Sequence, residues 1–65
     1  MKNRVRELRL ERDWTQKELG SRLGMSRQAI IAIENGKFDP SLKLALRLSR
    51  RFKKRVEDVF QLDEA

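Results

Sequence analysis

The feature that most restricts the fold is a pair of helix-start signals separated by one glycine. Thr15, followed three residues later by Glu18, forms the capping-box pattern that satisfies free amides at the start of a helix. Ser26 can cap a further helix, and Gly24 before it can adopt the positive φ of a tight turn. This stretch therefore predicts two short helices joined by a sharp bend.

Similar signals divide the rest of the chain into short helices. We expect helices at about residues 3–12, 16–23, 26–35, 39–52 and 56–60. The fourth is expected to open with Asp39 as its N-cap and Pro40 in the first helical position. Alternation of apolar and polar residues never persists, so only a short strand in the C-terminal tail stays open. The expected fold class is all-α, a compact bundle of five short helices.

Composition excludes several kinds of chemistry. The 65 residues are enough for one domain, residues 1–65, with one small core, and they include no cysteine and no histidine. Disulfides, thiolate zinc sites and histidine general bases are therefore excluded. No carboxylate pair lies beside a nucleophile, and no glycine-rich loop is present to cradle a phosphate. We expect no enzymatic activity, no cofactor and no metal.

The charge balance indicates the class of partner. Sixteen Lys and Arg against ten Asp and Glu give a formal charge of +6. This favours a polyanion, with nucleic acid as the first choice and an acidic membrane surface as the second. No apolar run approaches the roughly 20 residues that span a membrane, and the charged start does not resemble a secretory signal. We expect a cytoplasmic protein without a membrane partner.

Four short motifs in and around this bend indicate which kind of helix-turn-helix it is. Q-x-E-L, S-R-Q-A-I, I-E-N-G-K and P-S-L follow one another within residues 15–52. In this order and spacing they resemble the XRE-type helix-turn-helix family, which includes the lambda repressor and Cro, and the resemblance covers about residues 5–60. It implies a lambda-repressor-like bundle of five helices. The helix-turn-helix would occupy residues 16–35, with its second helix in the DNA major groove.

The resemblance also implies roles for individual residues. The positions that face the bases in the groove, or lie at its edge, correspond to Ser26, Arg27, Gln28, Ile31 and Ala32. The positions that contact phosphates correspond to Gln16, Asn35, Lys37 and Lys43. Arg9 and Glu34 resemble a structural ion pair between the first and third helices.

Side-chain chemistry at the start of the third helix fits base contact. The amide of Gln28 can donate and accept together, as adenine N6 and N7 require, and the fork of Arg27 suits guanine O6 and N7. Each such pair supplies about 1–3 kcal/mol of base discrimination. Ile31 stands where many members of the family have a small polar residue. It either contacts a thymine methyl group or forms a small apolar patch without function.

The densest charge lies elsewhere, in the basic run of Arg47, Arg50, Arg51, Lys53, Lys54 and Arg55. We do not assign this run to DNA, because in the family this helix end points away from the groove. Cations there favour the negative end of the helix dipole. They can also pair with Glu57, Asp58, Asp63 or Glu64. Lys53 replaces the glycine that the family often has, so a longer or strained turn is expected after Phe52.

The expected function is sequence-specific DNA binding by a transcriptional regulator, acting as a repressor that occupies promoter DNA. A single module buries only roughly 600–1,000 Å², so we expect a homodimer on a palindromic operator with half-sites about 34 Å apart. The tail, residues 61–65, is expected to dimerise, with a short strand that pairs with its copy. The candidate interface residues are apolar and need cover: Leu46, Phe60 and Leu62.

Three other functions stay open from the sequence. The chain could be an antitoxin or controller protein that represses its own operon. It could be a protein-interaction module that has lost DNA binding, although the presence of Arg27, Gln28 and Lys37 argues against this. It could also bind nucleic acid without sequence preference, which a comparison of operator and random DNA at one salt concentration would detect.

Overall fold

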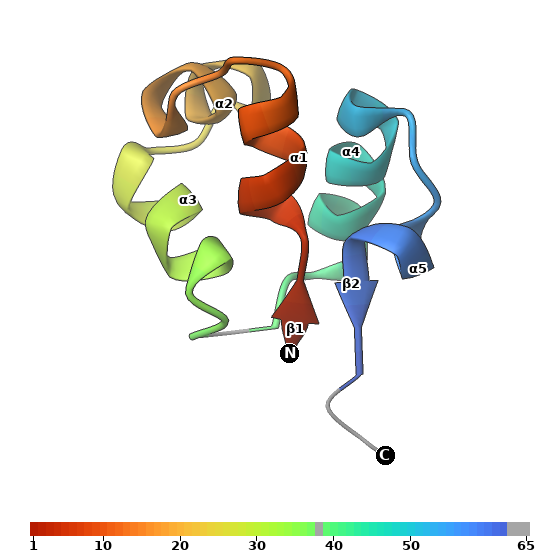
Figure 1. Cartoon of the computed structure of the whole chain (residues 1–65). Helices are drawn as coiled ribbons and strands as arrows, with labels where there is room; N and C mark the ends of the chain where they lie inside the picture. Colours follow the sequence, from red (N-terminus) through yellow and green to blue (C-terminus); the bar gives the residue numbers. More distant parts are fainter. Residues whose placement is uncertain (38, 63–65) are drawn as a thin grey trace.

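The structure confirms the five-helix bundle and adds a small two-stranded sheet. It is a computed structural model that describes residues 1–37 and 39–62. The elements are β1 (Lys2–Asn3), α1 (Val5–Glu11), α2 (Gln16–Leu23), α3 (Arg27–Glu34), α4 (Leu42–Phe52), α5 (Val56–Val59) and β2 (Phe60–Gln61). In Figure 1, α2 and α3 lie on one side of α1, and α4, α5 and β2 lie on the other.

Local capping explains the boundaries of α2 and α3. The Thr15 side chain accepts a hydrogen bond from the Glu18 amide, and the Glu18 side chain accepts one from the Thr15 amide. Gly24 ends α2 with φ 67°, in the left-handed region that glycine adopts without steric cost. The Ser26 hydroxyl then accepts from the Ala29 amide at 3.1 Å. These signals act within a few residues, so the sequence alone located both helices.

The expected start of the fourth helix was wrong. Its N-cap is Ser41, whose hydroxyl accepts a hydrogen bond from the Leu44 amide at 3.1 Å, and α4 begins at Leu42. Asp39 lies before the helix, where its carboxylate is 3.6 Å from the Met1 amine. Pro40 therefore precedes the cap rather than following it. Serine and aspartate cap equally well, so the local sequence does not decide between them. In the folded chain Asp39 lies near Met1, and Ser41 caps the helix.

The first and last helices are shorter than expected because their outer ends form strands. The α1 helix begins at Val5, since Lys2 and Asn3 pair as β1 with β2 in an antiparallel ladder. The α5 helix ends at Val59, and Phe60 is extended. The expected C-terminal strand is thus present, but its observed partner is the start of the same chain rather than a second copy.

One apolar core lies between the helices. Its buried members are Val5, Leu8, Leu19, Leu23, Ile30, Ile33, Ala45, Leu48, Phe52, Val59 and Phe60. Trp14 packs at its edge, with its ring centroid 6.0 Å from that of Phe52. The Arg12 guanidinium lies 5.1 Å from the Phe52 ring centroid and donates to the Leu8 and Phe52 carbonyls. This cation joins the C-terminal ends of α1 and α4, a role that the sequence did not reveal.

The end of α4 is strained, as the replacement of glycine suggested. Lys53 has φ 56° and ψ 43°, in the left-handed region. The turn closes normally, because the Lys53 amide donates to Arg50 at 3.2 Å and the Lys54 amide donates to Ser49 at 3.0 Å. A left-handed backbone costs a residue that has a Cβ atom about 1–2 kcal/mol. The turn is therefore strained at one residue rather than lengthened.

We predict that Lys53→Gly stabilises the fold. The free energy of unfolding should rise by up to about 1 kcal/mol, because relief of the left-handed strain exceeds the added freedom of glycine in the unfolded chain. Urea denaturation measures the change. Lys53→Ala is the matched control, since it removes the same charge and keeps the strain. Equal stability of the two variants would contradict the explanation.

Candidate nucleic-acid interface

The α2–α3 bend is held by close contact between backbones. A Cβ atom placed on Gly20 would lie 2.5 Å from the Met25 carbonyl oxygen. The Met25 amide in turn donates to the Gly20 carbonyl at 2.8 Å. The turn therefore passes directly over α2, which fixes the direction in which α3 leaves it. This is the helix-turn-helix geometry that the spacing of Thr15, Gly24 and Ser26 predicted.

The α3 helix has one buried face and one open face. Ile30 and Ile33 are buried in the core, whereas Arg27 and Gln28 are exposed at the start of the helix. Among the other residues that the resemblance placed at the groove, Ser26 is exposed and Ile31 and Ala32 are half-buried. The Ser26 hydroxyl already serves as the cap. The open face therefore begins with a guanidinium and an amide on a rigid support.

The residues expected to bind phosphates lie around this helix, but they differ in exposure and in their bonds to the protein. Asn35, Lys37 and Lys43 are exposed, and Asn35 is also the C-cap of α3. Gln16 is half-buried, and its Nε2 donates to Glu34 Oε1 at 3.1 Å. One of its two amide hydrogens is therefore held by the protein, and the other is left for an outside acceptor. The contact between Gln16 and Glu34 carried no signal in the sequence.

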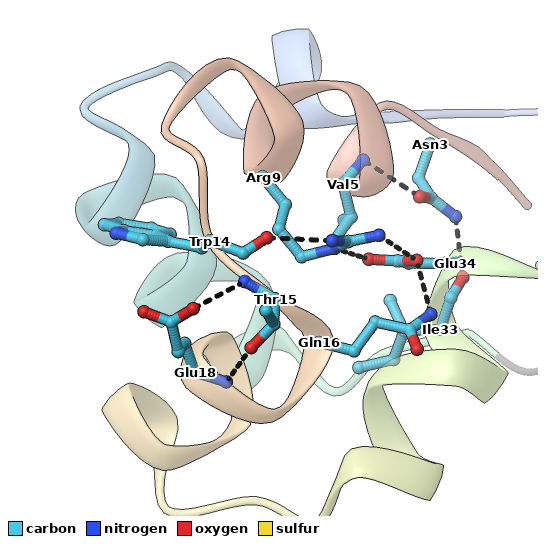
Figure 2. Close-up of polar contacts among 9 residues, drawn as sticks. All are labelled: Asn3, Val5, Arg9, Trp14, Thr15, Gln16, Glu18, Ile33 and Glu34. Atoms are coloured by element: carbon cyan, nitrogen blue, oxygen red, sulfur yellow. Dashed lines mark hydrogen bonds and ion pairs between the residues drawn. The ribbon is translucent and has the colours of Figure 1, made fainter.

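Arg9 and Glu34 form a buried ion pair between α1 and α3, the pair that the resemblance implied. Arg9 Nε donates to Glu34 Oε2 at 2.7 Å, and Nη2 donates to Oε1 at 3.3 Å. Only 8% and 3% of the two side chains are exposed. Arg9 Nη1 also donates to the Trp14 carbonyl at 2.9 Å. Figure 2 shows the carboxylate of Glu34 between Arg9 and Gln16, so one acid joins three helices.

Asn3 completes the network, although sequence reasoning missed it. Its Nδ2 donates to the Ile33 carbonyl at 2.8 Å, and its Oδ1 accepts from the Val5 amide at 3.1 Å. The same side chain thus binds the first amide of α1 and the last turn of α3 (Figure 2). The bond to Val5 is local, since asparagine side chains often bind amides two residues along the chain. The contact with Ile33 had no such local signal.

The start of α2 carries its own negative group. The Thr15 amide donates to the Glu18 carboxylate, and this bond holds the pKa of Glu18 below its ordinary value. The carboxylate therefore stays charged at neutral pH beside the positive end of the helix dipole. Any phosphate near this helix start would have to be bound by neighbouring side chains.

Part of the basic run binds the protein itself. Arg47 Nη2 donates to the Leu23 carbonyl at 2.7 Å, and Arg51 Nη2 donates to the Arg22 carbonyl at 3.2 Å. Both carbonyls are at the C-terminal end of α2, where positive charge is favourable. Arg55 pairs with Glu57 at 2.9 Å on the surface. Of the other acids that we expected as partners, Asp63 and Glu64 lie outside the described residues.

The candidate dimer residues differ in how much of each side chain is exposed to a partner. Leu46 is 47% exposed and Leu62 is 67% exposed, but only 7% of Phe60 is exposed. Phe60 already has cover within its own chain, so the reason for expecting it at an interface does not hold. Leu42, which is 72% exposed, was missed. It lines an apolar hollow together with Pro40, Val56 and Leu62.

Within residues 1–37 and 39–62, no three acidic, histidine or cysteine side chains gather where a metal ion could bind. None of the helices described in this part of the chain is both long enough and apolar enough to cross a membrane.

We predict that Arg9→Ala removes much of the stability, because it leaves the Glu34 carboxylate buried without a counterion. The expected loss in free energy of unfolding is about 3–5 kcal/mol, measured by urea denaturation or as loss of a cooperative thermal transition. Arg4→Ala is the control, since it breaks the exposed Arg4–Glu7 pair and should cost less than about 1 kcal/mol. Equal losses in the two variants would show that burial does not increase the contribution of the Arg9–Glu34 pair to the free energy of unfolding.

Comparisons with known proteins agree with this geometry. The family described as helix-turn-helix matches residues 5–59. An uncharacterized HTH-type transcriptional regulator of Methanocaldococcus jannaschii is 50% identical over 60 residues, which cover 92% of this chain and 91% of the relative. The regulator YgzD of Bacillus subtilis is 47% identical, with 98% and 97% covered. With its tight α2–α3 bend and exposed α3 face, the protein belongs to the XRE-type helix-turn-helix family of DNA-binding transcriptional regulators.

Proposed function

We propose that the protein is a sequence-specific repressor that inserts α3 into the major groove of its operator. One observation carries the proposal: α3 buries Ile30 and Ile33 while it exposes Arg27 and Gln28 at its start. In helix-turn-helix proteins the N-terminal residues of the second helix contact base edges. Repression would follow because a bound protein occupies promoter DNA. Such a protein would act in the cytoplasm.

The exposed residues divide into two functional groups. Arg27 and Gln28 would read bases, with Ser26, Ile31 and Ala32 nearby, because a guanidinium fork and an amide match guanine and adenine edges. Gln16, Asn35, Lys37 and Lys43 would bind phosphates and so fix the position of α3 without reading sequence. Half-burial of Ile31 leaves part of its side chain open, as contact with a thymine methyl group would require.

A homodimer on a palindromic operator is part of the proposal. The apolar hollow with Leu42 and Leu62 adjoins α5 and β2, on the opposite side of α1 from α3 (Figure 1). The molecule measures 33 × 22 × 20 Å. Two copies joined on this side would carry their α3 helices toward opposite ends of the dimer, as half-sites about 34 Å apart require. Leu46 on α4 would lie near the same contact.

We predict that base-reading and phosphate-binding residues differ in their effect on specificity. A duplex selected from a random pool and a random duplex are compared at one salt concentration. Arg27→Ala and Gln28→Ala should each cost about 1–3 kcal/mol on the selected duplex and relax the preference at particular base pairs. Lys37→Ala should weaken binding to both duplexes alike and lower the salt slope by about one unit. Equal losses on both duplexes for all three variants would refute base reading by α3.

The dimer is tested by the combined variant Leu42→Glu and Leu62→Glu. Analytical ultracentrifugation at tens of micromolar should show a dimer for the wild type and a monomer for this variant. A carboxylate at each position would be buried without a partner in the interface. Leu10→Glu is the control, because Leu10 is 52% exposed but lies on α1. A wild type that is monomeric at this concentration would exclude the dimer.

A further inference from the structure

A second cationic surface lies beside the start of α2. The function proposed above uses Gln16 and Arg27 from this surface but gives no role to Arg6 and Lys17. A hollow there is lined by Arg6 of α1, Lys17 of α2 and Arg27 at the start of α3, with Gln16 and Asp13 also in its lining. The three cations are exposed and come from three different helices. None of them forms an ion pair with another described residue, so their charge is free for an outside partner.

The groups around the hollow leave it with an excess of positive charge. Arg9 also lines it, but its charge is neutralised by Glu34. Asp13 is the one acid among the lining residues, against Arg6, Lys17 and Arg27. Trp14 and Leu10 also line the hollow, so part of its wall is apolar. Electrostatic attraction of an anion is therefore stronger here than at isolated surface lysines.

The position of the hollow favours one anion, the DNA backbone. Arg27 belongs both to this hollow and to the face of α3 that would enter the groove. In this fold the first helix of the helix-turn-helix crosses the backbone. Gln16 also lines the hollow, and Glu34 holds one of its amide hydrogens, so the side-chain amide is oriented. A phosphate bound at Gln16 would therefore lie at the same hollow as Arg6 and Lys17.

We propose that this hollow is a phosphate-binding site for DNA, in which Arg6 and Lys17 bind backbone phosphates beside the one at Gln16. The site extends the DNA contact from the helix-turn-helix onto α1. The inference rests on DNA binding through α3. It assigns two phosphate contacts that neither the motifs nor the family resemblance indicated, and Asp13 opposes them.

The test compares two double variants that lose the same charge. Arg6→Gln with Lys17→Gln removes the site, while Arg50→Gln with Lys54→Gln removes two exposed cations at the far end of α4. The probes are the duplex selected from a random pool and a random duplex, each titrated over a salt series. The first variant should lose affinity for both duplexes, by roughly tenfold for each lost contact, and should lower the salt slope by about two units. The second should match the wild type. All four residues are exposed, and circular dichroism verifies the fold.

Asp13→Asn provides a change of opposite sign. Asp13 has φ 57°, and asparagine tolerates this left-handed conformation. Loss of the carboxylate should raise affinity for both duplexes several-fold. A third measurement replaces single phosphates with neutral methylphosphonates along the selected duplex. At the phosphates bound in the hollow, the replacement should weaken wild-type binding and leave the Arg6→Gln, Lys17→Gln variant unchanged.

The outcomes separate this inference from the proposed function. If both double variants change the salt slope equally, or if no neutral phosphate is coupled to Arg6 and Lys17, the site is overturned while base reading by Arg27 and Gln28 can stand. If the wild type shows no preference for a selected duplex, sequence-specific recognition fails first. In that case a selective loss for Arg6→Gln, Lys17→Gln on random DNA would still support the phosphate site.

Discussion

The arrangement of the interface depends on one buried carboxylate. Glu34 accepts hydrogen bonds from Arg9 on α1 and from Gln16 on α2, and it belongs to α3 itself. A buried charge without partners would be very costly, so packing that leaves this carboxylate unpaired is strongly disfavoured. Asn3 adds a bond from the start of the chain to the Ile33 carbonyl. The surface that would meet DNA is therefore positioned by polar contacts beneath it, in addition to the apolar core.

The basic run shows why charge density is a poor guide to the interface in a small protein. Arg47 and Arg51 donate to carbonyls at the end of α2. Their charge is thus used in joining α4 to the helix-turn-helix. By contrast, Arg6, Lys17 and Arg27 are scattered in the sequence and come together only in the folded chain. What matters for a polyanion is the arrangement of charge on the folded surface.

Sequence reasoning succeeded where structure is decided locally. Both ends of α2 and the start of α3 follow from Thr15, Gly24 and Ser26, which act on amides and φ angles at or near their own positions. It failed where residues distant in the sequence decide the outcome. Asp39 and Ser41 are both competent caps, and only the folded chain, with Met1 beside Asp39, distinguishes them.

The same limit applied to the candidate site. The family resemblance indicated which residues of α3 face the groove, but no local pattern could link Gln16 to Glu34 or bring Arg6 beside Lys17. The strained Lys53 was found only because its position is one where the family often has glycine. Comparison with a family pattern therefore revealed a conformational cost that composition alone would have hidden.

The short ladder between β1 and β2 has a consequence for how the molecule folds. Most contacts in a bundle of short helices join residues that are close in sequence, and such contacts form quickly. The pairing of Lys2 with Gln61 instead closes a loop of nearly the whole chain. The entropy of that closure is offset only when the helices are already in place. The two ends of the chain therefore pair last during folding and separate first in the native state. Each of the two strands is stabilised by its pairing with the other.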